Sequence, residues 1–103
     1  MNNGALVSQS AISPAVCQFA TAKGVGEYLH AVIDLARQAF PASAIDVSVG
    51  QDTEDETHQY IAVDVDVGGK ATEELLTGQR VWSAGLARVC PSRYAVYFVL
   101  GWR

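Results

Sequence analysis

Two stretches in which apolar and polar residues alternate one by one most constrain what this chain can fold into. The apolar positions are Ile45, Val47 and Val49 in the first stretch and Ile61, Val63, Val65 and Val67 in the second. Such a period of two is typical of β-strands with one buried face. Residues 50–57, which lie between the stretches, are rich in acids. We therefore predict a β-hairpin with a long acidic loop, in a sheet that is covered on one side only.

Charge favours one register for this hairpin. Pairing Val47 with Ile61 places Asp46 opposite Ala62, whereas the neighbouring register places Asp46 opposite Asp64. Like charges directly opposite each other destabilise a sheet. We therefore expect the first register.

Two helices are predicted before the hairpin. Ser13 followed by Pro14 is typical of a helix start, because the hydroxyl caps free backbone N–H groups and proline fits the first helical position. This signal predicts a short helix over residues 14–22. Apolar residues at three- and four-residue spacing predict a longer helix over residues 25–40, which Pro41 ends.

A third helix and a last strand are predicted after the hairpin. The helix covers residues 73–89, and its interior glycines, Gly78 and Gly85, indicate close approach to a bulky neighbour. The strand covers residues 93–102 and is apolar on both faces. One face would hold Tyr94, Val96, Phe98, Leu100 and Trp102, and the other Ala95, Tyr97 and Val99.

These elements predict an α+β fold, a two-layer sandwich in the order α-α-β-β-α-β. Its three-stranded mixed sheet would carry the helices on one face. The second and third strands should run parallel, because a helix connects them. We expect one domain over residues 13–103, preceded by a mobile tail over residues 1–12.

The charge is uneven along the chain, which has 103 residues and a formal net charge of −4. An acidic chain repels phosphate, so no nucleic-acid partner is expected. Residues 46–74 contain nine acidic residues and one lysine, whereas residues 75–103 contain four arginines and no acid. The expected acidic surface consists of Asp46, Asp52, Glu54, Asp55, Glu56, Asp64 and Asp66. It would suit a basic protein partner.

The sequence gives no sign of secretion or membrane insertion. The first ten residues lack the pattern of a signal peptide. The longest apolar run has seven residues, Tyr94–Leu100, whereas a membrane span needs about 20. Two cysteines are too few for a disulfide scaffold. We expect a soluble cytoplasmic protein with no membrane partner.

No motif predicts catalysis, a metal site or a cofactor. Gly68-Gly69-Lys70 lacks the earlier glycine and the following hydroxyl of a phosphate-binding loop. Cys17 and Cys90 lack the spacing of structural zinc ligands and are expected to be buried as small apolar residues. We therefore expect no catalytic residue, no metal ligand and no cofactor.

The doubly apolar last strand favours an interaction function, because the predicted chain has no second layer to cover it. A non-enzymatic, homodimeric protein-interaction module is the first hypothesis, with interface candidates Tyr94, Tyr97, Val99 and Trp102. An alternative is a small-molecule binding protein with a pocket between sheet and helices, and the pocket candidates are Phe40, Trp82 and Phe98. A third is a small enzyme that uses the carboxylates Asp46, Asp64 and Asp66.

The chain also resembles a group of small, uncharacterised bacterial proteins. The resemblance covers about residues 13–103 and rests on Ser13-Pro14-Ala15, on the segment 24–29 (Gly-Val-Gly-Glu-Tyr-Leu) and on Phe40-Pro41. Members are often encoded beside another small gene, in a manner similar to toxin–antitoxin modules. The resemblance implies a protein that binds a partner in a regulatory or antitoxin-like role. It implies no catalytic residue.

The hairpin hypothesis is testable with Val63→Asp. This substitution should unfold the domain, because it places an unpaired charge on the buried face. Thermal unfolding followed by circular dichroism measures the effect. A wild-type melting curve would show that the strand is shifted by one residue and that Val63 faces solvent.

Overall fold

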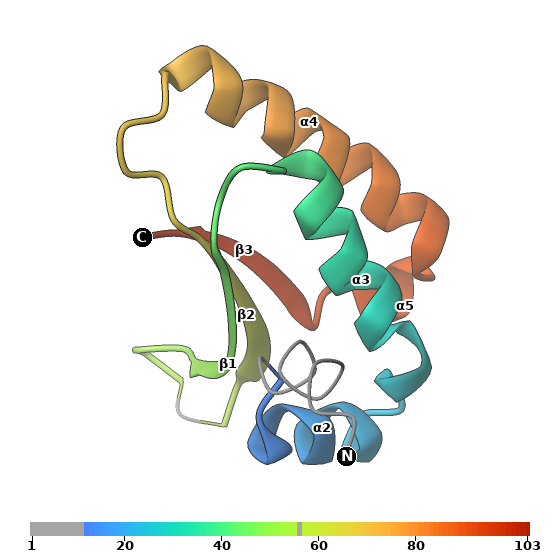
Figure 1. Ribbon diagram of the computed structural model, residues 1–103. Coiled ribbons are helices and arrows are strands. Elements are labelled where there is room, and N and C mark those ends of the chain that lie inside the picture. Colours follow the sequence, from blue (N-terminus) through green and yellow to red (C-terminus); the bar gives the residue numbers. More distant parts are fainter. Residues whose placement is uncertain (1–11, 56) are drawn as a thin grey trace, which may run out of the picture.

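The computed structural model describes residues 12–55 and 57–103. In chain order the elements are α2 (Pro14–Ala22), α3 (Gly26–Ala39), β1 (Ile45–Gln51), β2 (Gln59–Val65), α4 (Thr72–Val89), α5 (Ser92–Ala95) and β3 (Phe98–Trp102). They form an α+β fold with a three-stranded mixed sheet, as predicted (Figure 1). The predicted tail lies outside the described residues except for Ile12, which packs against the core.

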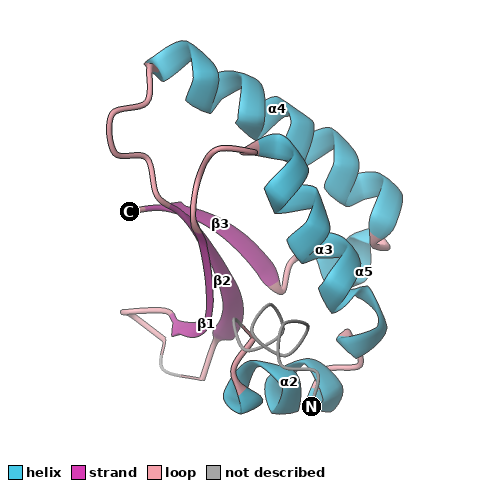
Figure 2. Cartoon of the chain, in the orientation of Figure 1, coloured by secondary structure: helices cyan, strands magenta, loops and turns pink. Residues whose placement is uncertain are grey.

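The helices gather on one side of the sheet (Figure 2). The strand order is β1-β2-β3, in which β1 and β2 are antiparallel and β2 and β3 are parallel. This confirms the predicted parallel pair. Helices α3 and α4 pack against each other, while α2 contacts β1 and β2. Ser13 caps α2 as expected, because the Val16 N–H donates to its Oγ at 3.3 Å.

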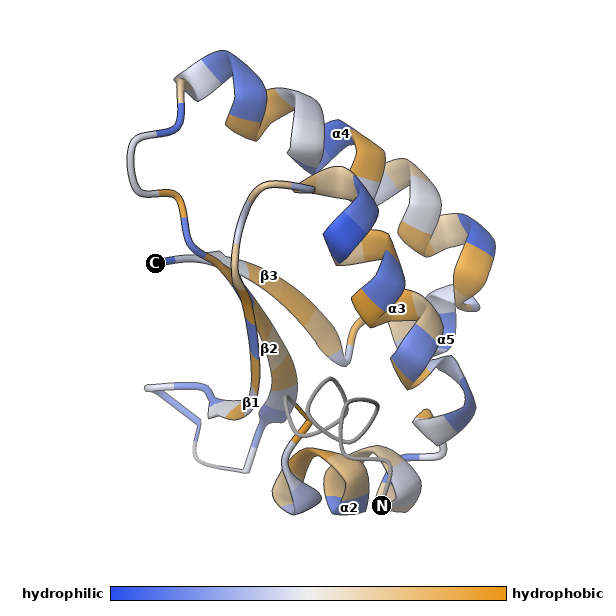
Figure 3. Cartoon of the chain, viewed as in Figure 1, coloured by the Kyte–Doolittle hydropathy of each residue, from blue (hydrophilic) through white to orange (hydrophobic). Residues whose placement is uncertain are grey.

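The apolar core is centred on β2. Ile61, Val63 and Val65 are fully buried, and Val47 of β1 and Phe98 of β3 are buried beside them. Hydrophobic residues accordingly follow β2 and β3, whereas the loop between β1 and β2 is hydrophilic (Figure 3). The assignment of buried and polar hairpin faces is therefore confirmed.

The predicted hairpin register is wrong. Val47 pairs with Val63, which sets Asp46 directly opposite Asp64. Two neighbours offset the repulsion between these carboxylates. Arg103 forms an ion pair with Asp46 at 3.1 Å, and Asp64 leans the other way, over the space that a side chain at Gly101 would fill. Without this arginine, the two acids alone would favour the other register.

The last strand is shorter than predicted. Residues 92–95 form the short helix α5 instead of sheet, because the N–H groups of Tyr94 and Ala95 donate to the carbonyl of Pro91 at 2.9 and 3.0 Å. The Tyr94 ring then lies against Tyr28, with ring centroids 5.7 Å apart. Only Phe98–Trp102 joins the sheet.

Two glycines of α4 allow the close approach to α3 that the sequence indicated. A Cβ atom at Gly78 would overlap the Phe40 ring, and one at Gly85 would overlap the end of the Leu35 side chain. Phe40 also makes an edge-to-face contact with Trp102, with ring centroids 5.5 Å apart. The ring that fills the space at Gly78 therefore has a second packing partner.

Gly78→Ala should destabilise the protein by up to about 2 kcal/mol. Overpacking costs about 1–3 kcal/mol, and the gain of about 1 kcal/mol that alanine brings to a helix interior offsets part of it. Chemical denaturation measures the free energy of unfolding. Gly26→Ala is the matched control, because its nearest neighbour would be 3.8 Å away, and it should be neutral or stabilising. Equal effects at both positions would contradict close packing at Gly78.

Candidate interaction surface

The sheet has an outer face that no described helix covers. The residues on this face are Asp46, Ser48 and Gly50 of β1, Tyr60, Ala62 and Asp64 of β2, and Val99 and Gly101 of β3. Two of the cross-strand pairs join a glycine to a larger residue. The Tyr60 ring lies over Gly50, and the Asp64 carboxylate lies over Gly101. Both side chains thus lie down along the sheet, which leaves this face flat.

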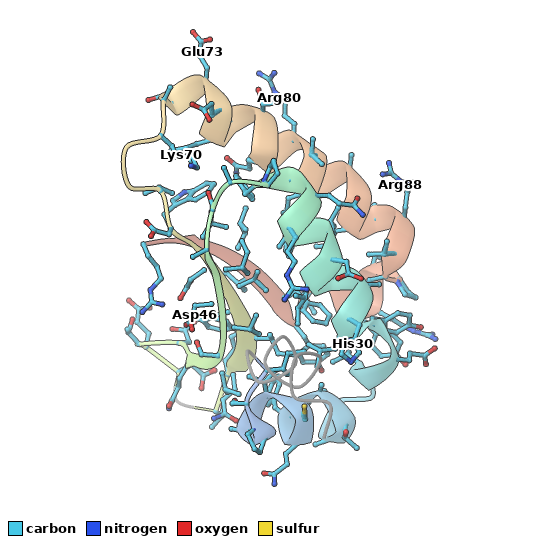
Figure 4. The ribbon with its side chains drawn as sticks, in the orientation of Figure 1. His30, Asp46, Lys70, Glu73, Arg80 and Arg88 are labelled. Atoms are coloured by element: carbon cyan, nitrogen blue, oxygen red, sulfur yellow. The ribbon has the colours of Figure 1, made fainter. Side chains whose placement is uncertain are left out.

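The carboxylates Asp46, Asp64 and Asp66 have separate partners or neighbours. Asp46, on the side of the sheet turned away from the helices (Figure 4), is paired with Arg103. Asp66 accepts the N–H of Gly68 at 3.0 Å. Asp46, Asp66 and Arg103 border a hollow of about 410 Å³, which Asp64 does not line. Within residues 12–55 and 57–103, no group of three His, Cys, Asp or Glu side chains is placed to hold a metal ion.

The residues around β3 combine buried and exposed apolar side chains. Of the predicted interface residues, Tyr94 packs on Tyr28, and Tyr97 packs edge-to-face on Phe19 at 6.3 Å. The other two are exposed: Val99 by 41% on the outer face and Trp102 by 45% at the end of the strand. Val96 is a third exposed apolar side chain, at 64%. The sequence predicts it in the last strand, on the same face as Phe98, but in the structure it precedes β3.

One edge of β3 is free of any strand in the described part of the chain. The Ile61 N–H donates to the Tyr97 carbonyl at 2.6 Å, and the Arg103 N–H donates to the Val65 carbonyl at 2.8 Å. Backbone groups alternate in direction along a strand, so the odd-numbered residues of β3 bond to β2. The N–H and C=O groups of Phe98, Leu100 and Trp102 therefore point outward from the sheet.

Two acidic side chains of the hairpin loop accept hydrogen bonds that stabilise its turns. Asp52 accepts the N–H of Glu54 at 2.8 Å. Asp55 accepts both the N–H of Thr57 at 3.0 Å and its hydroxyl at 2.6 Å. These bonds, the hydroxyl first, lower the pKa of the Asp55 carboxyl below its usual range. Glu56 of the predicted acidic surface lies outside the described residues.

The predicted pocket residues lie in different surroundings. Trp82 and Phe98 are buried in the core. Phe40 is buried too, and it also borders a hollow of about 400 Å³ where α3 ends and α4 begins, which Lys70 and Glu73 help to line. Lys70 points back under the start of α4, while Glu73 projects away from it (Figure 4). This hollow lies at the helix ends and not between sheet and helices.

The two cysteines differ in burial. Cys90 is 1% exposed, and burial raises the pKa of its thiol, which disfavours the nucleophilic thiolate. Cys17 is exposed, contrary to the prediction that both are buried. It lies on the solvent side of α2, whose buried residues are Val16, Phe19 and Ala20.

Comparison of the chain with models of protein families, with curated proteins and with solved structures found no match. None of the described helices is both long enough and apolar enough to cross a membrane. The surface around β3 therefore has to be interpreted from its own geometry.

Thr57→Val should raise the pKa of the Asp55 carboxyl toward its ordinary value, because the substitution removes the hydroxyl that favours the charged form. An NMR pH titration of the Asp55 side chain measures this shift. Thr53→Val in the same loop is the control and should leave the Asp55 pKa in place. No change in the Thr57→Val variant would mean that the loop holds Asp55 in another way.

Proposed function

We propose that this chain is a non-enzymatic protein-interaction module that works as a homodimer through the region of β3. The observation that carries the proposal is the free edge of this strand, flanked by the exposed side chains of Val96, Val99 and Trp102. An unpaired strand edge offers backbone groups to another chain. Apolar side chains beside it add burial when that chain arrives.

The polar groups of the molecule support a binding role over catalysis. Asp52, Asp55 and Asp66 accept hydrogen bonds from their own turns, and Asp46 is paired with Arg103. An active site needs such groups to converge on a common point in a cleft. In this protein, the carboxylates instead stabilise the turns beside them or pair with Arg103.

The acidic loop supplies a second contact for a different protein. Asp52, Glu54 and Asp55 lie at the far end of the hairpin, away from the free edge of β3. Negative charge there would speed the approach of a basic partner. We propose a regulatory, antitoxin-like role of this kind, in which the dimer presents one acidic loop from each copy.

We place this function in the cytoplasm of a bacterium. Cys17 and Cys90 are both free thiols in the structure, which fits a reducing compartment. The bacterial source is part of this proposal and rests on the resemblance of segments 13–15 and 24–29 and of Phe40-Pro41 to small paired-gene proteins.

Val99→Lys should give a folded monomer, because it places a charge beside the proposed contact without entering the core. Sedimentation of the unmodified and variant chains at high micromolar concentration measures their mass. Val81→Lys is the matched control, since Val81 is also 41% exposed but lies on α4. It should leave the dimer intact. An unmodified chain that sediments as an 11.0 kDa monomer would contradict the proposed function.

A further inference from the structure

The free edge of β3 also indicates how two copies would meet. Resting on the proposed function, we infer that β3 pairs antiparallel with β3 of a second copy, on a two-fold axis at Leu100. The result is a continuous six-stranded sheet. A strand that pairs antiparallel with its own copy gives a closed two-fold dimer, because each contact occurs twice.

The two edges of the sheet differ in whether they carry residues that discourage pairing with another chain. Natural edge strands carry charges, prolines or bulges that discourage pairing with other chains. Residues 98–102 (Phe-Val-Leu-Gly-Trp) contain no charge and no proline. At the opposite edge, β1 carries Asp46 within its pairing region. The unguarded edge is thus the one beside the exposed Val99 and Trp102.

The register follows from the direction of the backbone groups. Leu100 is the middle one of the three residues whose N–H and C=O groups point outward, so an axis at Leu100 uses the whole strand. Trp102 then lies opposite the partner's Phe98, and Val99 lies opposite the partner's Gly101. Arg103 lies opposite the partner's Tyr97. No two like charges face each other, which is the condition that antiparallel pairs require.

Charge favours edge pairing over packing of the two outer faces. Face-to-face packing would cover Asp46 and Asp64 and bring them near the same acids of the second copy. Edge pairing instead leaves five strand spacings between the two β1 strands, about 24 Å in total. This separation exceeds the screening length of about 8 Å at physiological salt. The acidic hairpins then stand at opposite ends of the sheet.

Amide hydrogen exchange tests the edge directly. In a dimer of this kind, the N–H groups of Leu100 and Trp102 should exchange at least tenfold more slowly at high micromolar concentration than on dilution to monomer. The N–H groups of Val99 and Gly101 bond to β2 and should be protected at both concentrations. A dimer with unprotected Leu100 and Trp102 amides would overturn the inference and leave the proposed function standing. A monomer at every concentration would overturn both.

Disulfide formation tests the register in a Cys17→Ser background. Residues that face each other in a hydrogen-bonded antiparallel pair have Cα atoms about 5.5 Å apart, within reach of a disulfide. Leu100→Cys should therefore form a covalent dimer under mild oxidation. Val99→Cys should form little covalent dimer, because Val99 lies opposite the partner's Gly101 and the two residues 99 are therefore offset along the strands. Cross-linking at Val99 but not at Leu100 would favour packing of the outer faces and overturn the edge pairing.

Discussion

The burial of β2 is the constraint on which the other elements depend. Ile61, Val63 and Val65 have no exposed surface, and such side chains need cover from apolar partners. The strands β1 and β3 complete the backbone pairing of β2, while the helices cover its apolar face. Because β2 takes the central place in the three-stranded sheet that the described residues form, both of its neighbours are edge strands in this part of the chain. The free edge of β3 is thus a direct result of building a small sheet around one buried strand.

The contact between α3 and α4 extends this constraint to the helical layer. Gly78 and Gly85 let α4 approach Phe40 and Leu35 without intervening side chains. Phe40 in turn touches Trp102, the last residue of β3. One aromatic ring therefore links the helix pair to the end of the edge strand. Trp102 packs against Phe40 and is still 45% exposed at the end of the strand.

The sequence predicted the elements that local pattern controls and missed those that distant partners decide. Alternating valines identified the buried face of the hairpin, and Ser13 with Pro14 located the start of α2. The register was missed because Arg103, which neutralises Asp46, lies far along the chain. The unbroken apolar run that begins at Tyr94 favours a strand from the sequence alone. In the fold, Tyr94 packs against Tyr28 and Tyr97 packs against Phe19. The spacing of apolar residues along the chain does not predict contacts between such distant residues. Among the interface candidates, only Val99 and Trp102 are therefore left exposed.

The glycines that accommodate larger neighbours have a consequence for how this sequence can change. At Gly101 the space above the backbone is occupied by the carboxylate of Asp64, and at Gly50 by the ring of Tyr60. At each position the neighbour's side chain occupies the space that a Cβ atom would take, so a side chain added at the glycine would displace it. A side chain gained at Gly101 would require the Asp64 carboxylate to move aside or to be replaced by a smaller group, and the same holds for Gly85 with the end of the Leu35 side chain. In homologous chains these positions should vary as linked pairs, and each pair would mark a contact of this fold even where overall similarity is low.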